Sequence, residues 1–446
     1  MTIRRLLIAN RGEIAARIIR TCDRLGIETV LAASEADMDS VPARLAGRAI
    51  CIGPAPSARS YLNAPAIVAA ALAARVDAIH PGYGFLSEST TLAELARKSG
   101  LIFIGPTEEQ LANVGDKLRA RELAEAAGLP VVPGGAVGSL DDAKRLVAKI
   151  GCPILIKAVG CGGGRGMKLL EEPSKTEETI ALAMSEAEAA FADSRIYLER
   201  FVAHGRHVEV QLLGDRERVI HLGERDCSIQ RRYQKLVEEA PAPKLNEALR
   251  MRLHQAGVAY GAAMKYQGLG TVEFLVDAAR DEFYFLEMNA RIQVEHPVTE
   301  GVTSLDLVAE QIAVADGGKF SEPVRFSGHA IEFRINAEDT AHDFRPSPGT
   351  VTEAIFPAGD GIRIDTHIEA GSSVPPFYDS LLAKIIVHAC DRPAALARAR
   401  TALANCRIEG VATNLSMHRA ILEDAEFGRG GVDTTFFPRF RERKRG

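Results

Sequence analysis

The 446-residue sequence lacks the features that mark several large classes of protein. Its seven cysteines form neither a C-x-x-C pair nor a zinc-ligand spacing, which is typical of free thiols in a reducing compartment. The longest apolar stretch, residues 66–74, ends at Arg75 and is far too short to span a bilayer. A net charge of −5 provides no basic field for nucleic acid. We therefore expect a cytoplasmic protein that binds neither membranes nor nucleic acid.

The first twenty residues contain five arginines, as some mitochondrial presequences do. However, Glu13 breaks the acid-poor pattern of such segments, and residues 4–10 are better interpreted as a buried strand. We expect no targeting segment here.

Length and periodicity predict three units, because 446 residues exceed a single ordinary core. Over residues 1–113, short apolar strands alternate with amphipathic helices, which indicates a parallel α/β domain. Residues 114–317 change to α+β with hairpins, and residues 329–446 form a third, mixed α+β unit. The polar segment 316–328 is the expected connector.

A glycine-rich segment, KAVGCGGGRGMK at 157–168, matches neither common phosphate-binding signature. It joins two predicted strands, so Gly162, Gly163 and Gly164 would let backbone amides fold over a phosphate chain as a flap. Lys157, on the entering strand, would add a positive charge for the same anion. The alternative is a flexible hairpin tip without a ligand.

Two strands at 271–276 and 282–289 are predicted to form a hairpin. If Glu273 pairs with Glu287, their carboxylates lie about 5 Å apart on one face and repel each other unless a cation bridges them. Mg²⁺ favours such carboxylates, and Asn289 follows on the same face. The alternative is a pair of solvated glutamates.

The segment after this hairpin carries Arg291, Gln293 and Glu295 at alternate positions. In an extended chain these side chains would share one face, where arginine and glutamine suit a small oxyanion and glutamate could act as a general base. A polar strand exit is the alternative. A second polar run, 223–243, includes Lys235 and could equally be a solvated salt-bridge cluster.

Taken together, these segments resemble the biotin carboxylases of the ATP-grasp superfamily, and the resemblance covers nearly the whole chain. The motifs occur in the order IANRGEIA (8–15), HPGYGFLSE (80–88), GDK (115–117), the glycine segment, RHVEVQ (206–211), ERDCSIQRR (224–232), EEAPAP (238–243), MNARIQVEHPVTE (288–300), RINAED (334–339) and GGVDTTFF (430–437). The resemblance implies an N-terminal α/β domain at 1–113 that precedes an ATP-grasp domain at 114–317. It also implies a flap subdomain at about 130–203 and a biotin carboxylase C-terminal domain at 329–446.

The resemblance also assigns roles to individual residues. It implies that ATP is bound by Lys117, Lys157, Gly162, Gly163, Gly164, Glu199, Arg200, Val202, His207 and Gln230. Mg²⁺ or Mn²⁺ would be held by Glu273, Glu287 and Asn289. Bicarbonate would be bound by Lys235, Arg291, Gln293, the backbone of Val294 and Glu295, whereas Arg334 and Tyr83 would face biotin. Glu295, Arg334, Lys235 and Arg291 are the implied catalytic residues.

The implied reaction is the first half-reaction of acetyl-CoA carboxylase or another acyl-CoA carboxylase. Glu295 deprotonates bicarbonate, which attacks the γ-phosphate of ATP to give carboxyphosphate, and the CO₂ released from it carboxylates biotin. AAMKY at 262–266 matches the biotin-attachment motif A-M-K-M only in part, so biotin carboxyl carrier protein and carboxyltransferase are expected on separate chains. The family is commonly homodimeric.

Two other functions stay open at this point. One is an ATP-grasp ligase for another acceptor, although the segments 291–300 and 334–339 favour biotin. The other is a nucleotide-binding regulatory protein without turnover, which the complete set of proposed catalytic residues opposes. Tyr233, where the family commonly has histidine, puts one nucleotide contact in doubt.

Overall fold

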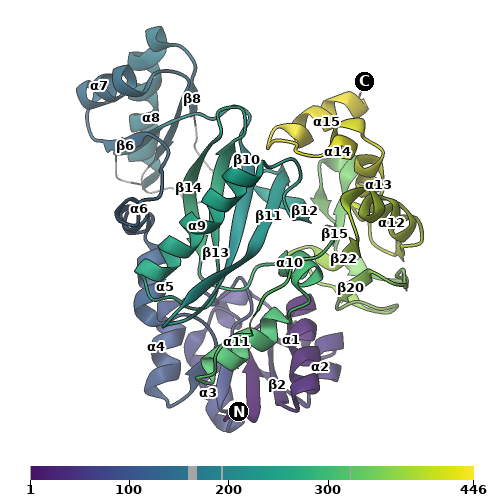
Figure 1. Cartoon of the computed structure of the whole chain (residues 1–446). Helices are drawn as coiled ribbons and strands as arrows, with labels where there is room; N and C mark the ends of the chain where they lie inside the picture. The colour runs from purple at the N-terminus through teal and green to yellow at the C-terminus, as the bar shows by residue number, and fades with distance from the viewer. Residues whose placement is uncertain (1, 159–167, 192–193, 322, 446) are drawn as a thin grey trace.

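The computed structural model describes residues 2–158, 168–191, 194–321 and 323–445 (Figure 1). The glycine flap predicted from Gly162, Gly163 and Gly164 lies outside these described residues.

The N-terminal region is a five-stranded parallel sheet in the order β3-β2-β1-β4-β5. In the central strand β1, Leu6 packs with Ile14 on one face and Leu7 packs with Ile67 on the other, as in a parallel sheet covered by helices on both sides. Its strands are β1 (Arg5–Ile8), β2 (Glu28–Ala33), β3 (Arg48–Cys51), β4 (Ala78–His80) and β5 (Ile102–Phe103). Its helices are α1 (Gly12–Leu25), α2 (Val41–Leu45), α3 (Ala64–Ala73) and α4 (Thr90–Lys98).

A second sheet of eight antiparallel strands runs through the middle of the molecule in the order β14-β13-β10-β11-β12-β15-β22-β20. Its strands are β10 (Arg206–Asp215), β11 (Val219–Arg231), β12 (Gln234–Ala240), β13 (Gln267–Asp277), β14 (Glu282–Asn289), β15 (His329–Asn336), β20 (Ile362–Thr366) and β22 (Leu381–Ala389). β12 pairs directly with β15, where Val237 lies opposite Phe333. The predicted second and third units therefore share one continuous sheet.

A small four-stranded sheet with two helices stands apart from this body at the upper left of Figure 1. Its strands follow the order β6-β9-β7-β8, and its own core includes Ile154, Ile156 and Leu198. Its elements are β6 (Gly134–Val137), α7 (Leu140–Ile150), β7 (Ile154–Ala158), β8 (Lys168–Leu170), α8 (Thr176–Phe191) and β9 (Ile196–Arg200). Helices α5 (Glu108–Gly115) and α6 (Lys117–Ala126) connect it to the N-terminal region.

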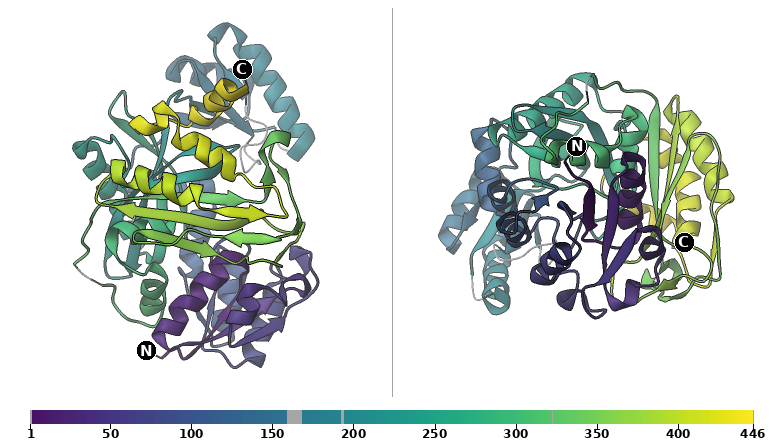
Figure 2. Two further views of the ribbon diagram at one scale, coloured as in Figure 1. Left: turned by 90° about the vertical axis from the view of Figure 1, so that its right-hand side faces the viewer. Right: turned by 90° about the horizontal axis from the view of Figure 1, so that it is seen from below.

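Helices pack on the large sheet, and the left view of Figure 2 shows the C-terminal helices, in yellow, in front of its light-green strands. α9 (Glu247–Ala263) packs on β10 and β11, α10 (His296–Thr303) packs on β15 and β22, and α11 (Leu307–Ala315) packs on β13. The C-terminal helices are α12 (Arg392–Ala404), α13 (Leu415–Leu422), α14 (Ala425–Arg429) and α15 (Phe436–Arg445). Short strand pairs are β16 (Glu338–Asp339) with β17 (Arg345–Pro346), β18 (Gly349–Thr350) with β21 (Ser373–Val374), and β19 (Glu353–Ile355) with β23 (Arg407–Glu409). Among the described helices, none combines the length and apolarity needed to cross a bilayer.

Candidate active site

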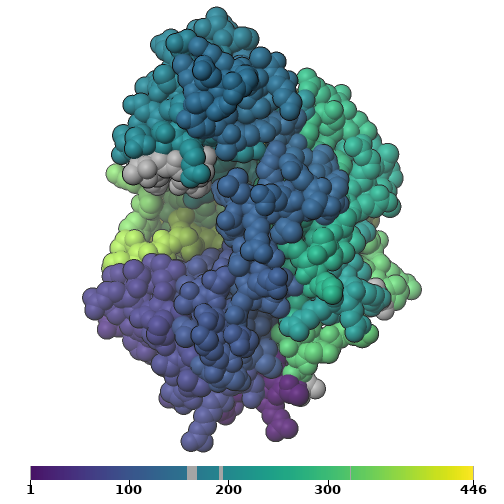
Figure 3. Space-filling model, turned by 90° about the vertical axis from the view of Figure 1, so that its left-hand side faces the viewer, coloured from purple at the N-terminus to yellow at the C-terminus, as the bar shows by residue number. Residues whose placement is uncertain are grey.

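A cavity of about 970 Å³ lies where these regions meet. Figure 3 shows the hollow between the small sheet region, in blue and teal, and the N-terminal region, in purple. Fifteen of the predicted site residues line the cavity: Tyr83, Lys117, Lys157, Glu199, His207, Gln230, Lys235, Glu273, Glu287, Asn289, Arg291, Gln293, Val294, Glu295 and Arg334. Arg200 and Val202 are described but do not line it, and Arg200 instead contacts Tyr284 and Glu282.

The hairpin β13–β14 brings the two predicted metal carboxylates together. Its register pairs Glu273 with Glu287 and Thr271 with Asn289, so the pairing expected from the sequence is confirmed. Burial raises the pKa of Glu273, but the charges of Lys235 and His207 outweigh it and hold that pKa well below the usual value. Partial desolvation and then the charge of Glu273 raise the pKa of Glu287. The two carboxylates and the Asn289 side chain form an oxygen donor set that fits a divalent cation.

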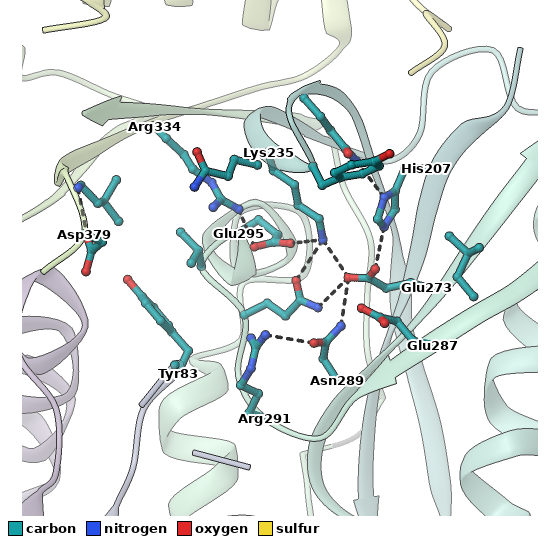
Figure 4. A pocket seen from close by; sticks show the side chains of 18 of the residues that line it. Tyr83, His207, Lys235, Glu273, Glu287, Asn289, Arg291, Glu295, Arg334 and Asp379 are labelled. Carbon is teal, nitrogen blue, oxygen red and sulfur yellow. Dashed lines mark hydrogen bonds and ion pairs between the residues drawn. The ribbon is translucent and has the colours of Figure 1, made fainter. Parts of the chain in front are cut away.

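Lys235, on β12, is the centre of a buried cluster of charges (Figure 4). Its Nζ lies 2.5 Å from Glu209 Oε2, 2.7 Å from Glu295 Oε1 and 2.9 Å from Glu273 Oε1. Gln293 Oε1 is a further acceptor at 3.2 Å. Burial lowers the pKa of Lys235, but the carboxylates outweigh it and place the pKa well above the usual value. The ammonium therefore stays charged and fixes three carboxylates around one point.

His207 and Gln230 border the metal carboxylates on the other side. His207 Nε2 lies 2.9 Å from Glu273 Oε2, and its Nδ1 lies 2.8 Å from Gln230 Nε2. Burial lowers the pKa of His207, but the charge of Glu273 outweighs it, so the pKa is raised overall. Ligand atoms of His207, Glu209 and Glu273 lie close enough together to share one metal ion.

Glu295 bridges the lysine cluster and Arg334. While Oε1 accepts from Lys235, Oε2 accepts from Arg334 Nη2 at 2.9 Å. Burial raises the pKa of Glu295, but Lys235 and Arg334 outweigh it and hold that pKa well below the usual range. Arg334 Nε also donates to Glu238 Oε1 at 2.6 Å. Burial, only partly offset by Arg334, raises the pKa of Glu238 to about 7.

The segment from Arg291 to Glu295 is not the extended strand that alternation suggested. It is an irregular loop that turns from β14 into α10. Gln293 and Glu295 turn toward Lys235, whereas Arg291 donates to Glu88 Oε2 at 3.0 Å and to Asn289 Oδ1 at 2.9 Å. Pro297 and the start of α10 prevent the strand from continuing. The resulting loop brings the side chains of Gln293 and Glu295 together at Lys235.

The remaining predicted nucleotide residues lie toward the small sheet. Lys117 begins α6, and Lys157 on β7 pairs with Glu199 on β9, with 2.5 Å between Nζ and Oε1. Tyr83 lies on the opposite side of the cavity, on the same side as Arg334 and Asp379 (Figure 4). We call the end beside the small sheet the nucleotide end and the end beside Arg334 the acceptor end, after the ligands predicted there from the sequence.

Several buried polar residues of the site did not emerge from the sequence. Glu209 on β10 and Arg225 on β11 are fully buried, and Arg225 Nε donates to Glu209 Oε1 at 2.6 Å. Glu238 and Lys384 are also fully buried. The sequence signal for these residues was a charged residue within an otherwise apolar strand. Such a residue is buried only when it is paired, so it indicates a buried charge cluster.

Comparisons with known proteins agree with this architecture. Residues 116–323 match the family model "Carbamoyl-phosphate synthase L chain, ATP binding domain", which defines the chain as an ATP-binding enzyme. Residues 2–111 match "Biotin carboxylase, N-terminal domain", and residues 332–439 match "Biotin carboxylase C-terminal domain". The chain belongs to the biotin carboxylase family and is a ligase.

The similarity to characterised relatives extends over the full chain. The biotin carboxylase of Nostoc sp. is 48% identical over 442 residues, which are 98% of this chain and 99% of the relative. The biotin carboxylase domain dimer of Hydrogenobacter thermophilus 2-oxoglutarate carboxylase, solved with MgADP, ADP and bicarbonate, has a TM-score of 0.91 and 41% identity, with 99% of this chain and 98% of that chain covered. Rhizobium etli pyruvate carboxylase is similar to 98% of this chain over 40% of its own length, with a TM-score of 0.88 and 40% identity.

These findings confirm the fold class and family predicted from the sequence. They also place related chains both in dimers and within longer carboxylases. The domain limits at 1–113, 114–317 and 329–446 and the roles of individual residues stay predictions.

Proposed function

We propose that this cavity catalyses the ATP-dependent carboxylation of biotin with bicarbonate, through carboxyphosphate, as the first half-reaction of acetyl-CoA carboxylase or another acyl-CoA carboxylase. The observation that carries this proposal is the position of Glu295, whose two oxygens contact Lys235 and Arg334 at 2.7 and 2.9 Å. The Glu295 carboxylate thereby lies between Lys235, which would bind bicarbonate, and Arg334, which would face biotin.

The nucleotide end supports binding of ATP with a divalent cation. Glu273, Glu287 and Asn289 would hold Mg²⁺ or Mn²⁺, which when bound supplies positive charge to the phosphate oxygens. Lys117 and Lys157 would face the phosphates. The same proposal assigns nucleotide contacts to Gly162, Gly163, Gly164, Glu199, His207 and Gln230, whereas Arg200 and Val202, also predicted from the sequence, do not line the cavity.

The bicarbonate site lies around Lys235. Lys235, Arg291, Gln293 and the Val294 amide bind the anion, and Glu295 removes its proton. The ion pairs with Lys235 and Arg334 keep Glu295 unprotonated, and they also lower its basicity. The bicarbonate oxygen then attacks the γ-phosphorus of ATP, and the bond to ADP breaks.

The acceptor end completes the reaction. Carboxyphosphate breaks down to CO₂ and phosphate, and this phosphate removes the N1′ proton of biotin. Arg334 stabilises the negative oxygen of the resulting enolate, with Tyr83 beside the same ring. Biotin N1′ then attacks CO₂, which gives carboxybiotin.

The proposal extends to the partners of the chain. The acceptor biotin would be attached to a separate biotin carboxyl carrier protein, and carboxyltransferase would be another chain. AAMKY at 262–266 lies where α9 ends and β13 begins. Lys265 is exposed there, but Tyr266, which stands where the attachment motif has its second methionine, is fully buried. We further propose that the chain is cytoplasmic. We also propose that it forms a homodimer, since the biotin carboxylase domain of Hydrogenobacter thermophilus 2-oxoglutarate carboxylase was solved as a dimer.

Phosphate release from MgATP and bicarbonate, measured with and without free biotin, tests the function. Biotin should stimulate release at saturating bicarbonate. The same ATP turnover with and without biotin would contradict the proposal.

A further inference from the structure

A buried lysine that the reaction above does not use lies beneath the loop that carries Glu295. Lys384 is on β22, which together with α1 and α10 encloses this part of the molecule (Figure 1). Its side chain is fully buried, and its Nζ donates to the carbonyl oxygen of Val294 at 2.7 Å. Nζ also lies 3.0 Å from Glu13 Oε1, on a second fully buried side chain.

Glu13 connects this lysine to the acceptor end of the cavity. It lies in the first turn of α1, and its Oε1 also accepts a hydrogen bond from the hydroxyl of Tyr83. One carboxylate oxygen therefore contacts both Lys384 and a residue proposed to face biotin.

The carbonyl that Lys384 contacts belongs to the peptide between Val294 and Glu295. Because a peptide unit is planar, fixing its carbonyl also fixes the backbone from which the Glu295 side chain leaves. Burial lowers the pKa of Lys384, but the charges of Glu13, Glu332 and Asp365 outweigh it and raise the pKa overall. The ammonium is thus a permanent donor at this position.

We propose that Lys384 is a positioning residue that fixes the peptide between Val294 and Glu295 and, through Glu13, ties it to Tyr83. Contacts among α1, the Glu295 loop and β22 then fix the Glu295 carboxylate relative to Tyr83. Buried ion pairs contribute little net stability, so a role in positioning the Glu295 loop is a physical reason for the ion pair between Lys384 and Glu13. The inference rests on the proposed function, since it assumes that Glu295 acts on bicarbonate.

Steady-state kinetics of Lys384→Met test this role. Displacement of Val294, whose backbone is proposed to bind bicarbonate, should raise KM for bicarbonate by about 10- to 100-fold, with KM for ATP nearly unchanged. Arg392→Met is the matched control, because Arg392 also joins a buried carboxylate, Glu239, to backbone carbonyls of another segment, yet does not line the cavity. The control should lower thermal stability without changing either KM.

Removing Lys384 alone leaves Glu13 buried without its cation, so the double variant Glu13→Gln/Lys384→Met protects the test against loss of folding. This variant should fold and show the same increase in KM for bicarbonate. Glu13→Gln alone keeps the bond from Lys384 to Val294, and should therefore raise KM for biotin more than KM for bicarbonate.

The results separate two kinds of failure. If the wild-type chain shows no biotin-stimulated phosphate release, the proposed function is wrong. If the wild type is active and a folded Lys384→Met variant, or the double variant, keeps the wild-type KM for bicarbonate, the positioning role alone is overturned.

Discussion

Both ends of the cavity contain several charged side chains close together, but the charges are arranged differently. At the acceptor end, Glu295, Lys235, Arg334 and Glu238 form alternating opposite charges with contacts of 2.6 to 2.9 Å. At the nucleotide end, Glu273 and Glu287 are like charges opposite each other, and the charge of Glu273 contributes to the raised pKa of Glu287. In the first arrangement the protein supplies both signs of charge. In the second, Lys235 and His207 contact Glu273, and the proposed cation would add positive charge beside Glu287.

The supporting structure differs in the same way. The acceptor end stands on adjacent strands β12 and β15 of the large sheet, where Glu238 lies opposite Glu332. Lys157, at the nucleotide end, comes from the small sheet, and its side chain is 36% exposed. We expect changes at the acceptor end to affect the rate of the chemical steps and changes at the nucleotide end to affect ligand binding. Four experiments test this contrast.

The largest effect is expected for Glu295→Gln. Loss of the proposed base should lower kcat by about 10²- to 10⁴-fold with little change in nucleotide affinity, measured by phosphate release and by ATP titration. Glu310→Gln is a control, because Glu310 is a buried carboxylate outside the cavity that accepts from the Ser321 amide at 3.0 Å. Near-normal kcat in Glu295→Gln would exclude it as the base.

Arg334→Met should have the next largest effect. Biotin-stimulated phosphate release should fall by about 100-fold or more, because the enolate oxygen loses its cation, while biotin-independent release should fall less. Arg334→Lys restores the charge without the planar fork and should recover only part of the rate. Equal loss of both rates would contradict an acceptor-side role.

At the nucleotide end, Glu287→Gln should act mainly on the cation. The Mg²⁺ concentration for half-maximal activity should rise by about tenfold, since one anionic ligand is lost, and excess Mg²⁺ should restore most of kcat. A titration of activity with Mg²⁺ at fixed ATP measures this. A defect that excess Mg²⁺ leaves unchanged would show that Glu287 is not a ligand.

The smallest effect concerns pH and Glu238. Its pKa of about 7 lies above the usual 4.5, so the folded protein binds a proton that the unfolded chain has lost between these values. The contribution of Glu238 to the free energy of unfolding therefore falls as pH rises from 4.5 to about 7. Between pH 5 and pH 8, the Tm of Glu238→Gln minus that of the wild type should increase by about 1 to 2 °C in thermal unfolding. A difference that is constant with pH would contradict the raised pKa.

Local pattern indicated the hairpin of β13 and β14 and the pairing of Glu273 with Glu287, which the structure confirms. The short turn alone would place Leu286 opposite Glu273, so this pairing also depends on a register shift between Glu273 and Phe274 that alternation does not reveal. The same reasoning failed for Arg291 to Glu295, because alternation cannot reveal that the chain leaves the strand and folds into a loop before α10.

The amino-acid sequence predicts the parallel α/β start of the chain, the carboxylate hairpin and, through its motifs, the family. It does not predict that β12 pairs with β15, which brings Glu238 to Arg334, or that Lys384 reaches the Glu295 loop. The physical reason is distance along the chain. Periodicity reports which face of an element is buried, but the partner of that face is selected only when distant strands pair and their charged side chains must be neutralised inside a common core.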